Sequence, residues 1–345
     1  MPSAWGLQGV LVKTVLVKTM FVGILCGSCI AAHAEVPQLD LGDIVAQKVK
    51  SDIASAMVLT DASLISLGII DFDPNKLIDF GKIDAGSEAS LERRKSLKSY
   101  SLPWEGSWEQ VTSEWQTATA ARFSYVDAHQ KVALSTENAE LNVQDDSSFL
   151  LFAEQKWRYQ LTEHWRLVLG AGAQMVWYKN TFDFRDPFIQ QFQSQLDKQL
   201  TNTSYAALMA DPSVQFSYTN RLWDYKWEFI STFRYGFGQT LFTDSDTQSV
   251  SPEVGRLSNA VIMHVDLPSV WNNRNEMRLL LKRIDLSGDS VEAMGTHNYY
   301  EFGAGWIIET PSISDWIANI GIGITINVNS GLSGGGVVLL FNEEL

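Results

Sequence analysis

The five histidines are the side chains in this sequence best suited to proton transfer near neutral pH. His297 precedes Asn298, and a hydrolase could use such an imidazole as a base beside an orienting amide, provided that a serine nucleophile is close. No His-x-Ser-Asn-Gly-like run accompanies this pair. His264 and Asp266 would share one face of a strand and could hydrogen-bond, which favours a structural pair over a general base. We therefore assign no catalytic residue.

The sequence also lacks the patterns that hold metals or cofactors, namely paired-histidine spacings, phosphate-binding glycine loops and nucleophile elbows. Cys26 and Cys29 both fall within residues 1–34. Two lysines, no acidic residue, a short apolar run and a final Ala32-His33-Ala34 triplet make this segment typical of a signal peptide. Cleavage before Glu35 would leave no cysteine for a disulfide or a metal-binding thiolate. No metal and no cofactor is therefore predicted.

Bulk composition excludes two classes of protein. The net charge of -14 at pH 7 argues against a nucleic-acid partner, because binding to a phosphate backbone needs a basic surface. No helix-length hydrophobic span follows residue 34, so an inner-membrane helical protein is excluded as well.

The dominant pattern from Phe149 onward is alternation of apolar and polar residues over long segments. One segment carries aromatic rings at most positions of a single face: Trp227, Phe229, Phe233, Tyr235 and Phe237. Strands of soluble sheets average about five or six residues, whereas a tilted strand needs about nine to eleven to cross a bilayer. Segment length therefore favours an all-β fold, a transmembrane antiparallel up-and-down β-barrel, over a soluble sandwich with the same period.

Aromatic residues also mark the ends of these segments, where an amphipathic ring belongs at a membrane surface. The predicted girdle consists of Trp165, Trp177, Trp223, Phe237, Trp271 and Trp316. Short connections alternate with longer ones near 180–206, 240–253 and 287–298. Outer-membrane barrels keep short turns in the periplasm. We therefore expect an outer-membrane protein in contact with lipid, with its long loops outside.

Strand counting starts from nine segments between about 148 and 345. A barrel with both chain termini in the periplasm needs an even number of strands, and 117–127 and 96–104 are the next candidates upstream. Ten strands are the minimum and twelve the preferred number. The predicted organisation is a signal peptide at 1–34, an N-terminal helical segment at 35–90 and a barrel at 91–345.

Two helices are expected outside the strands. In the N-terminal segment, apolar residues recur every four positions, which predicts an amphipathic helix: Leu41, Val45, Val49, Ile53 and Met57. This helix could pack at the periplasmic end of the barrel or pass through the lumen. In the longest loop, Asp186-Pro187 predicts a helix start that could fold inward or lie on the outer rim.

The strand face opposite the apolar one should line the lumen, because an Arg or Lys facing lipid at mid-membrane would cost about 2–4 kcal/mol. Its predicted charged residues are Lys156, Arg158, Arg166, Lys226, Glu228, Arg234, Arg256, Arg278, Lys282 and Glu301, together with Glu154 and Asp266. Cations outnumber anions in this set. The set is compatible with a plugged barrel in which the charges pair, or with a narrow pore that favours anions.

The C-terminus carries Gly336, Leu339 and Phe341 at the spacing of the terminal strand signal read by the barrel-assembly machinery, although four residues follow Phe341. A signal peptide, a helical stretch and a C-terminal barrel together resemble the autotransporter β-domain. Over roughly residues 90–345 the chain is most similar to the solitary autotransporter-like outer-membrane barrels. The resemblance implies a twelve-stranded barrel, a structural or translocation pore without a passenger. The alternative is a rim-active outer-membrane lipid hydrolase using His297.

Overall fold

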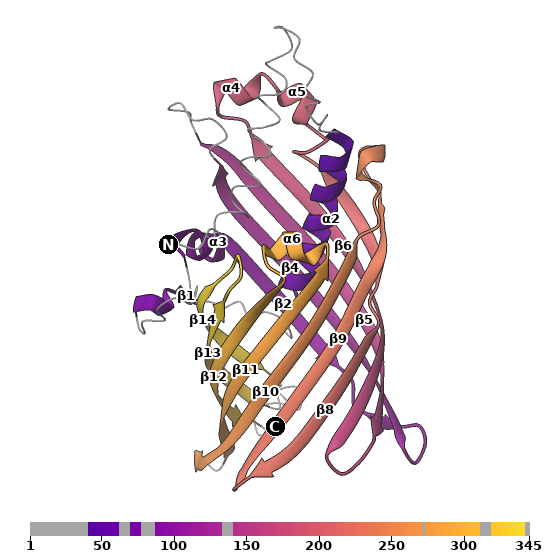
Figure 1. The fold of residues 1–345 in the computed structure, drawn as a ribbon, viewed down its shortest axis with the longest axis vertical. Helices are drawn as coiled ribbons and strands as arrows, with labels where there is room; N and C mark the ends of the chain where they lie inside the picture. The colour runs from indigo at the N-terminus through magenta and orange to yellow at the C-terminus, as the bar shows by residue number, and fades with distance from the viewer. Residues whose placement is uncertain are drawn as a thin grey trace, which may run out of the picture.

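A single antiparallel sheet curls into a barrel in the computed structural model (Figure 1). The structure describes residues 41–61, 70–76, 87–132, 141–270, 273–310 and 319–341. Within these ranges the sheet has fourteen strands, and its path runs β1-β14-β13-β12-β11-β10-β9-β7-β6-β5-β4-β2. That path has twelve positions because β3 and β8 lie off it. The predicted twelve-stranded antiparallel barrel is confirmed.

Most wall strands are long, as bilayer crossing requires, whereas β1 and β3 have only three and two residues. Their bounds are β1 Ile70–Phe72, β2 Leu97–Glu105, β3 Glu109–Gln110, β4 Trp115–Val132, β5 Asn142–Gln160, β6 Trp165–Asp183, β7 Ser204–Ala210, β8 Ser213–Leu222, β9 Tyr225–Leu241, β10 Glu253–Val270, β11 Asn273–Gly288, β12 Asn298–Glu309, β13 Asn319–Val328 and β14 Gly334–Phe341. Strands β2 and β4 confirm the two upstream candidates. Strands β7 and β8 both pair with β6 and β9, so they are two parts of one strand interrupted at Asp211-Pro212.

The two ends of the barrel differ in the connections they carry. Four-residue and two-residue connections join β5 to β6 and β8 to β9 at what we call the short-turn end. At the opposite, long-loop end lie the helices α4 (Pro187–Gln190), α5 (Gln193–Leu196) and α6 (Ser290–Met294) and the 3-10 turn η2 (Asp246–Gln248). Figure 1 shows α4 and α5 beyond the strand ends, so the predicted loop helix lies on the rim, as two short pieces.

Helix α4 starts at the predicted position. Asp186 caps α4 by accepting a hydrogen bond from the Phe188 backbone N–H at 2.9 Å. Ile189 of α4 is fully buried and packs with Phe182 and Phe184 at the end of β6 and with Leu196 of α5. This small apolar cluster holds the long loop against the barrel.

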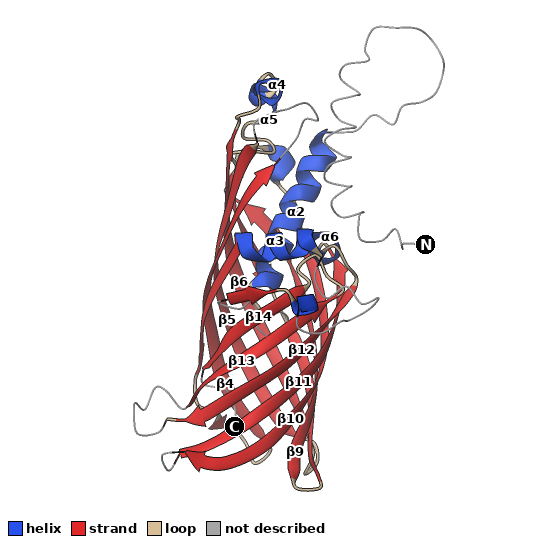
Figure 2. Cartoon of the chain, turned by 90° about the vertical axis from the view of Figure 1, so that its left-hand side faces the viewer, coloured by secondary structure: helices blue, strands red, loops and turns tan. Residues whose placement is uncertain are grey.

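Helix α2 (Leu41–Leu59) enters the barrel from the long-loop end (Figure 2). It contacts η2 and α6 in the long loops and β5, β6 and β10 in the wall. The buried residues of its apolar stripe form one cluster with inward-facing residues of the strands. Of the two placements left open by the sequence, the structure therefore has the helix in the lumen.

Helix α3 (Glu88–Ser96) lies beside both ends of the sheet path, since it contacts β1, β2, β4 and β14. The Ser87 hydroxyl accepts from the Ser90 N–H at 3.2 Å and caps the helix. At the other end of α3, the fully buried Arg94 donates to Asp71 of β1 at 3.0 Å and to the Leu332 carbonyl at 3.0 Å. Helix α3 thus fastens the first and last strands.

Some predictions fall outside the described residues. These are the signal peptide at 1–34 and the girdle residues Trp271 and Trp316. Among the helices of the described ranges, none combines the length and the hydropathy needed to cross a membrane.

Candidate functional site

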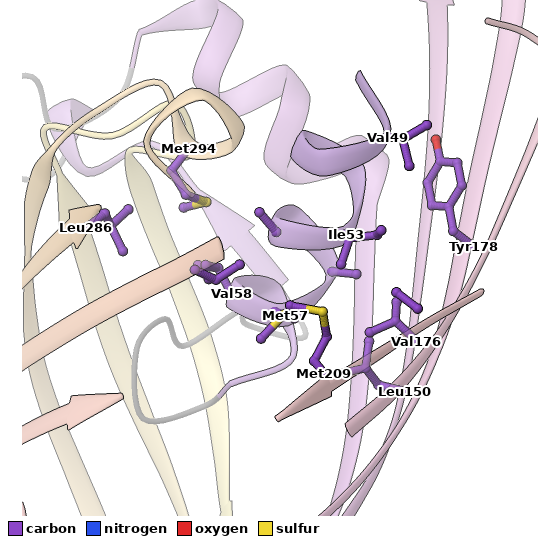
Figure 3. Packing of buried hydrophobic residues seen from close by; sticks show 14 of the residues in the cluster. Val49, Ile53, Met57, Val58, Leu150, Val176, Tyr178, Met209, Leu286 and Met294 are labelled. Carbon is purple, nitrogen blue, oxygen red and sulfur yellow. The ribbon is translucent and has the colours of Figure 1, made fainter. Parts of the chain in front are cut away.

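The lumen is the candidate functional site, and the apolar stripe of α2 fills its long-loop half. Ile53 and Met57 are fully buried. Figure 3 shows the stripe facing wall residues that include Leu150, Val176, Tyr178 and Met209. Burial of such side chains contributes about 1.5–3 kcal/mol each. The helix is therefore seated by an apolar core rather than suspended in a wide aqueous channel.

A glycine in the wall makes room for the helix. A Cβ atom on Gly236 of β9 would lie 2.5 Å from Cε of Met57, closer than carbon atoms approach. A larger residue at this position would therefore require the end of the Met57 side chain to move.

The sequence contains a local signal for this seat that periodicity alone did not reveal. Phe149 and Leu151 face outward and are exposed, while Leu150 between them faces inward and is fully buried. The same holds for Val176, buried between outward-facing Met175 and Trp177. A strand covered on both faces has a continuous apolar run instead of alternation. Such runs near the long-loop end mark where the wall meets α2.

Polar contacts fix α2 beside its apolar stripe. The Tyr205 hydroxyl donates to Asp52 of α2 at 3.0 Å, and Lys48 pairs with Asp52 one turn away. The Tyr178 hydroxyl donates to Asp146 at 2.6 Å, and its ring stacks on that of Tyr205 with centroids 4.9 Å apart. These contacts bind one side of α2 to the wall at β7.

Below the last turn of α2, carboxylates and guanidinium groups converge from five positions of the wall and from Asp61, which follows the helix. We call this set the charge belt: Asp61, Arg122, Glu154, Asp211, Arg234 and Arg256. Arg234 binds both oxygens of Glu154, at 2.9 and 2.8 Å, and contacts Asp211 at 3.3 Å. Arg256 also pairs with Asp211. Three cations thus face three anions, so the belt is balanced in charge.

The belt joins the wall to the helix through Asp61, which follows the end of α2. Its carboxylate accepts from Arg256 at 3.1 Å and lies 3.6 Å from Arg122. The Ser99 and Ser101 hydroxyls donate to the carbonyls of the last turn, at 3.1 Å to Leu59 and at 3.3 Å to Thr60. The C-terminus of a helix carries partial negative charge. The two arginines therefore stabilise both the carboxylate and the helix end.

Sequence reasoning placed three belt members in the lumen and missed the other three. Arg234, Arg256 and Glu154 were expected there, whereas Asp61, Asp211 and Arg122 were not singled out. Asp211 could have been found from the Asp-Pro pair within an otherwise regular strand, since proline cannot donate to a central ladder. The predicted excess of cations counted strand positions alone, and Asp61 and Asp211 offset it in the belt.

The other predicted lumen charges lie outside the belt. Lys282 and Glu301 are buried and pair at 3.0 Å across β11 and β12. Nearer the short-turn end, Lys226 pairs with Glu228 at 2.9 Å and Arg278 pairs with Glu276. The remaining predicted charges have other environments. Lys156 pairs with Glu105, and Arg158 donates to Gln116 and stacks on Trp108. Arg166 is half-buried, and the exposed Asp266 pairs with Arg274.

The predicted girdle residues whose side chains are described face outward, as does Leu339, whereas Gly336 is buried. Trp165, Trp177 and Phe237 are exposed, and Trp223 is 82% exposed at a hairpin tip. Residues 336, 339 and 341 all lie on β14, with Gly336 opposite both Asp71 of β1 and Thr325 of β13. Leu339 points outward and is 65% exposed.

The histidine pairs do not assemble a catalytic site. His264 Nδ1 lies 3.1 Å from Glu276, while Asp266 bonds Arg274, so the expected hydrogen bond between His264 and Asp266 is absent. His297 is exposed, and its backbone carbonyl accepts from Leu286. In the part of the chain that the structure describes, no group of three His, Cys, Asp or Glu side chains is placed to hold a metal ion.

Comparison with known proteins adds a family. Residues 50–343 match the model of the solitary outer membrane autotransporter beta-barrel domain, from the second half of α2 to the end of β14. A search of curated proteins returns no match.

Two solved structures are similar in part. The β domain of the Bordetella autotransporter BrkA is 9% identical, with 71% of this chain and 96% of that one covered at a TM-score of 0.38. The translocator domain of the autotransporter NalP from Neisseria meningitidis is 10% identical, with 70% and 84% covered at a TM-score of 0.35. The family model spans every strand of the wall and the second half of α2. The chain therefore belongs to the family of solitary outer membrane autotransporter β-barrel domains and is an outer-membrane β-barrel protein.

Proposed function

We propose that this barrel is a translocation pore that carries its own N-terminal segment to the exterior face and is then closed by α2. The observation that supports this most directly is the direction of α2. Its first residues contact the long-loop elements η2 and α6, including a 2.6 Å hydrogen bond from Gln47 to Glu292, and its end at Asp61 lies deep in the barrel.

The lengths of the loops give the orientation of α2 relative to the membrane. Outer-membrane barrels keep their short turns in the periplasm and their long loops outside. On that orientation Leu41, the first residue of α2, lies at the exterior end of the barrel, whereas β1 and β14 are part of the wall. An N-terminal segment reaches that face only by passing the barrel, which supports a translocation step over a purely structural role.

Closure after translocation is supported by the burial of the lumen wall. Inward-facing residues around α2 are fully buried, such as Leu150, Val176 and Ile284, whereas those near the short-turn end, such as Arg166 and Thr232, are partly exposed. A dry, close-packed interior leaves no path for hydrated ions. The helix therefore acts as a plug in the long-loop half.

The outer surface of the barrel supports the proposed contacts with lipid and with the barrel-assembly machinery. Exposed apolar side chains along the strands, such as Leu281, Phe302 and Ile322, are suited to contact outer-membrane lipid. Strand β14, which carries Gly336 and Leu339, is the segment that we propose the barrel-assembly machinery reads.

Cysteine labelling in whole cells tests the proposed topology. In a background with Cys26 and Cys29 replaced by serine, a membrane-impermeant maleimide would be applied to Asp43→Cys at the start of α2. Ser249→Cys reports the long-loop end and Asp224→Cys the short-turn end, since all three positions are exposed. We expect Asp43→Cys to label in intact cells as Ser249→Cys does, while Asp224→Cys labels only after permeabilisation. Protection of Asp43→Cys until permeabilisation would contradict the proposal.

A further inference from the structure

We propose that the charge belt is a latch, which keeps α2 in the lumen and the pore closed as long as its charges balance. This inference rests on the proposed function, because a latch needs a plug to hold. It assigns to Asp61 and Asp211 a role in gating that no strand pattern or family match gives them.

Asp61 links the end of α2 to the barrel wall through ion pairs. A carboxylate at a helix C-terminus is repelled by the helix dipole. Asp61 is nevertheless buried, and it is compensated by Arg256 at 3.1 Å and Arg122 at 3.6 Å, which belong to β10 and β4. The end of α2 is therefore bound to strands on different sides of the lumen. Neutralising this one carboxylate releases the helix end from both.

Asp211 connects the wall residues of the belt to one another. Its carboxylate accepts from Arg256, from Arg234 at 3.3 Å and from Gln174 at 3.0 Å. It projects from the Asp-Pro interruption between β7 and β8, where its own N–H still donates to Gly172 at 2.8 Å. Removing the charge leaves the belt with one excess cation in a buried position. Uncompensated buried charge is expensive, and water entry relieves it.

Some polar atoms in and beside the belt have no hydrogen-bond partner among the described residues. Nε of Arg122, Nε of Arg256 and Oε1 of Gln174 are buried, and within the described ranges they have no hydrogen-bond partner. Partly satisfied polar networks are the weak points of an interior, because hydration gains what the closed state lacks. The apolar seat of α2 gains nothing from water. The belt is therefore the part of the plug poised to open.

Planar-bilayer recording on the full chain tests the latch. Asp61→Asn and Asp211→Asn would be compared with the unmodified protein and with Asp266→Asn, which breaks an exposed ion pair with Arg274 at the rim. We expect the unmodified protein and Asp266→Asn to stay closed. Both belt variants should raise the fraction of time spent open at least about tenfold, because each leaves the buried belt with one cation in excess. The open pore should prefer anions.

Folding is monitored separately by the shift in gel migration of each variant before and after boiling. Asp61→Asn lies on the plug and not in the wall, so it keeps the test valid if Asp211→Asn fails to fold. Folded belt variants that stay as silent as the unmodified protein would overturn the latch. Steady conduction by the unmodified protein would also overturn it. Maleimide labelling of Asp43→Cys is independent of conduction, so failure of the proposed topology is distinguishable from failure of the latch.

Discussion

Met57 offers the sharpest test of how firmly α2 is seated. The side chain is fully buried between Gly236 of the wall and the cluster that includes Met209. Met57→Ala removes three heavy atoms from that space, and such truncations of buried residues cost about 2–5 kcal/mol. The loss applies to the seated state only, because a released helix has no such contacts. At about 1.4 kcal/mol per factor of ten, the released population should rise by about 30-fold to about 4,000-fold.

The assay measures how often α2 leaves the lumen. Ser51 is buried on the helix, and Ser51→Cys is nearly isosteric, so a thiol reagent reaches it only after release. In the background without Cys26 and Cys29, the labelling rate of Ser51→Cys reports the released population when reseating is fast. Met57→Ala in this background should raise that rate by at least about 30-fold.

A matched methionine provides the control. Met277 lies on β11 opposite Val265 and Trp306, on the outward face, and takes no part in the α2 cluster. Met277→Ala should leave the labelling rate of Ser51→Cys unchanged. A rate for Met57→Ala within about twofold of its parent would refute the reasoning, since such a change is worth only about 0.4 kcal/mol.

Three further predictions concern the wall and the rim. Gly170→Ala should lower the yield of folded barrel on a heat-modifiability gel, because the new methyl group would collide with the belt's glutamate, whereas Gly303→Ala, with 3.3 Å to its nearest neighbour, should be tolerated. Lys282→Met should lower the free energy of unfolding in urea by about 3–5 kcal/mol, because it removes the cation that pairs with the buried Glu301, and Glu301→Gln in the same chain should recover part of the loss. His297→Ala should leave the protein unchanged in a phospholipid-hydrolysis assay, with no fatty acid released by either form; activity lost on substitution would instead support the lipid hydrolase.

The outer face of this fold was predictable because lipid acts on every strand in the same way. A strand that crosses a bilayer must put apolar residues on alternate positions, and this requirement is local in the sequence. Segments such as Trp227–Phe237 therefore gave strand positions and facing directly. The start of α4 was also predictable from local features, because Asp186 is its N-cap and Pro187 its first helical residue.

The lumen was less predictable because its contacts depend on barrel closure. Arg122 and Arg256 lie far apart in the sequence and meet only through Asp61, after the sheet has curled and the helix has entered. Neither strand periodicity nor residue spacing contains that information. The position of the helix likewise depends on the assembled wall, because inward-facing residues such as Leu150 and Val176 make the wall apolar where α2 lies.

The apolar seat and the charge belt have different physical roles, and the periodicity of α2 shows why both are needed. Its apolar residues recur every four positions from Leu41 to Met57, so a shift along the helix axis by one turn would return an apolar residue to nearly every contact. Apolar contacts are non-directional and discriminate weakly between such registers. The same shift, about 5.4 Å, would carry Asp61 out of reach of Arg122 and Arg256.

The belt should therefore set the register of the plug as well as hold it. Spin labels on Asp43→Cys and Ser249→Cys measure the position of α2 against the long-loop end by electron–electron dipolar spectroscopy. With an intact belt the distance distribution should have one maximum. Asp61→Asn should add a second population displaced by about one helical turn, 5.4 Å, because the apolar contacts of α2 discriminate weakly between the two registers. A single, unshifted maximum in Asp61→Asn would mean that the polar contacts of Asp52 with Tyr205 already define the depth of the helix, and that the belt governs closure alone.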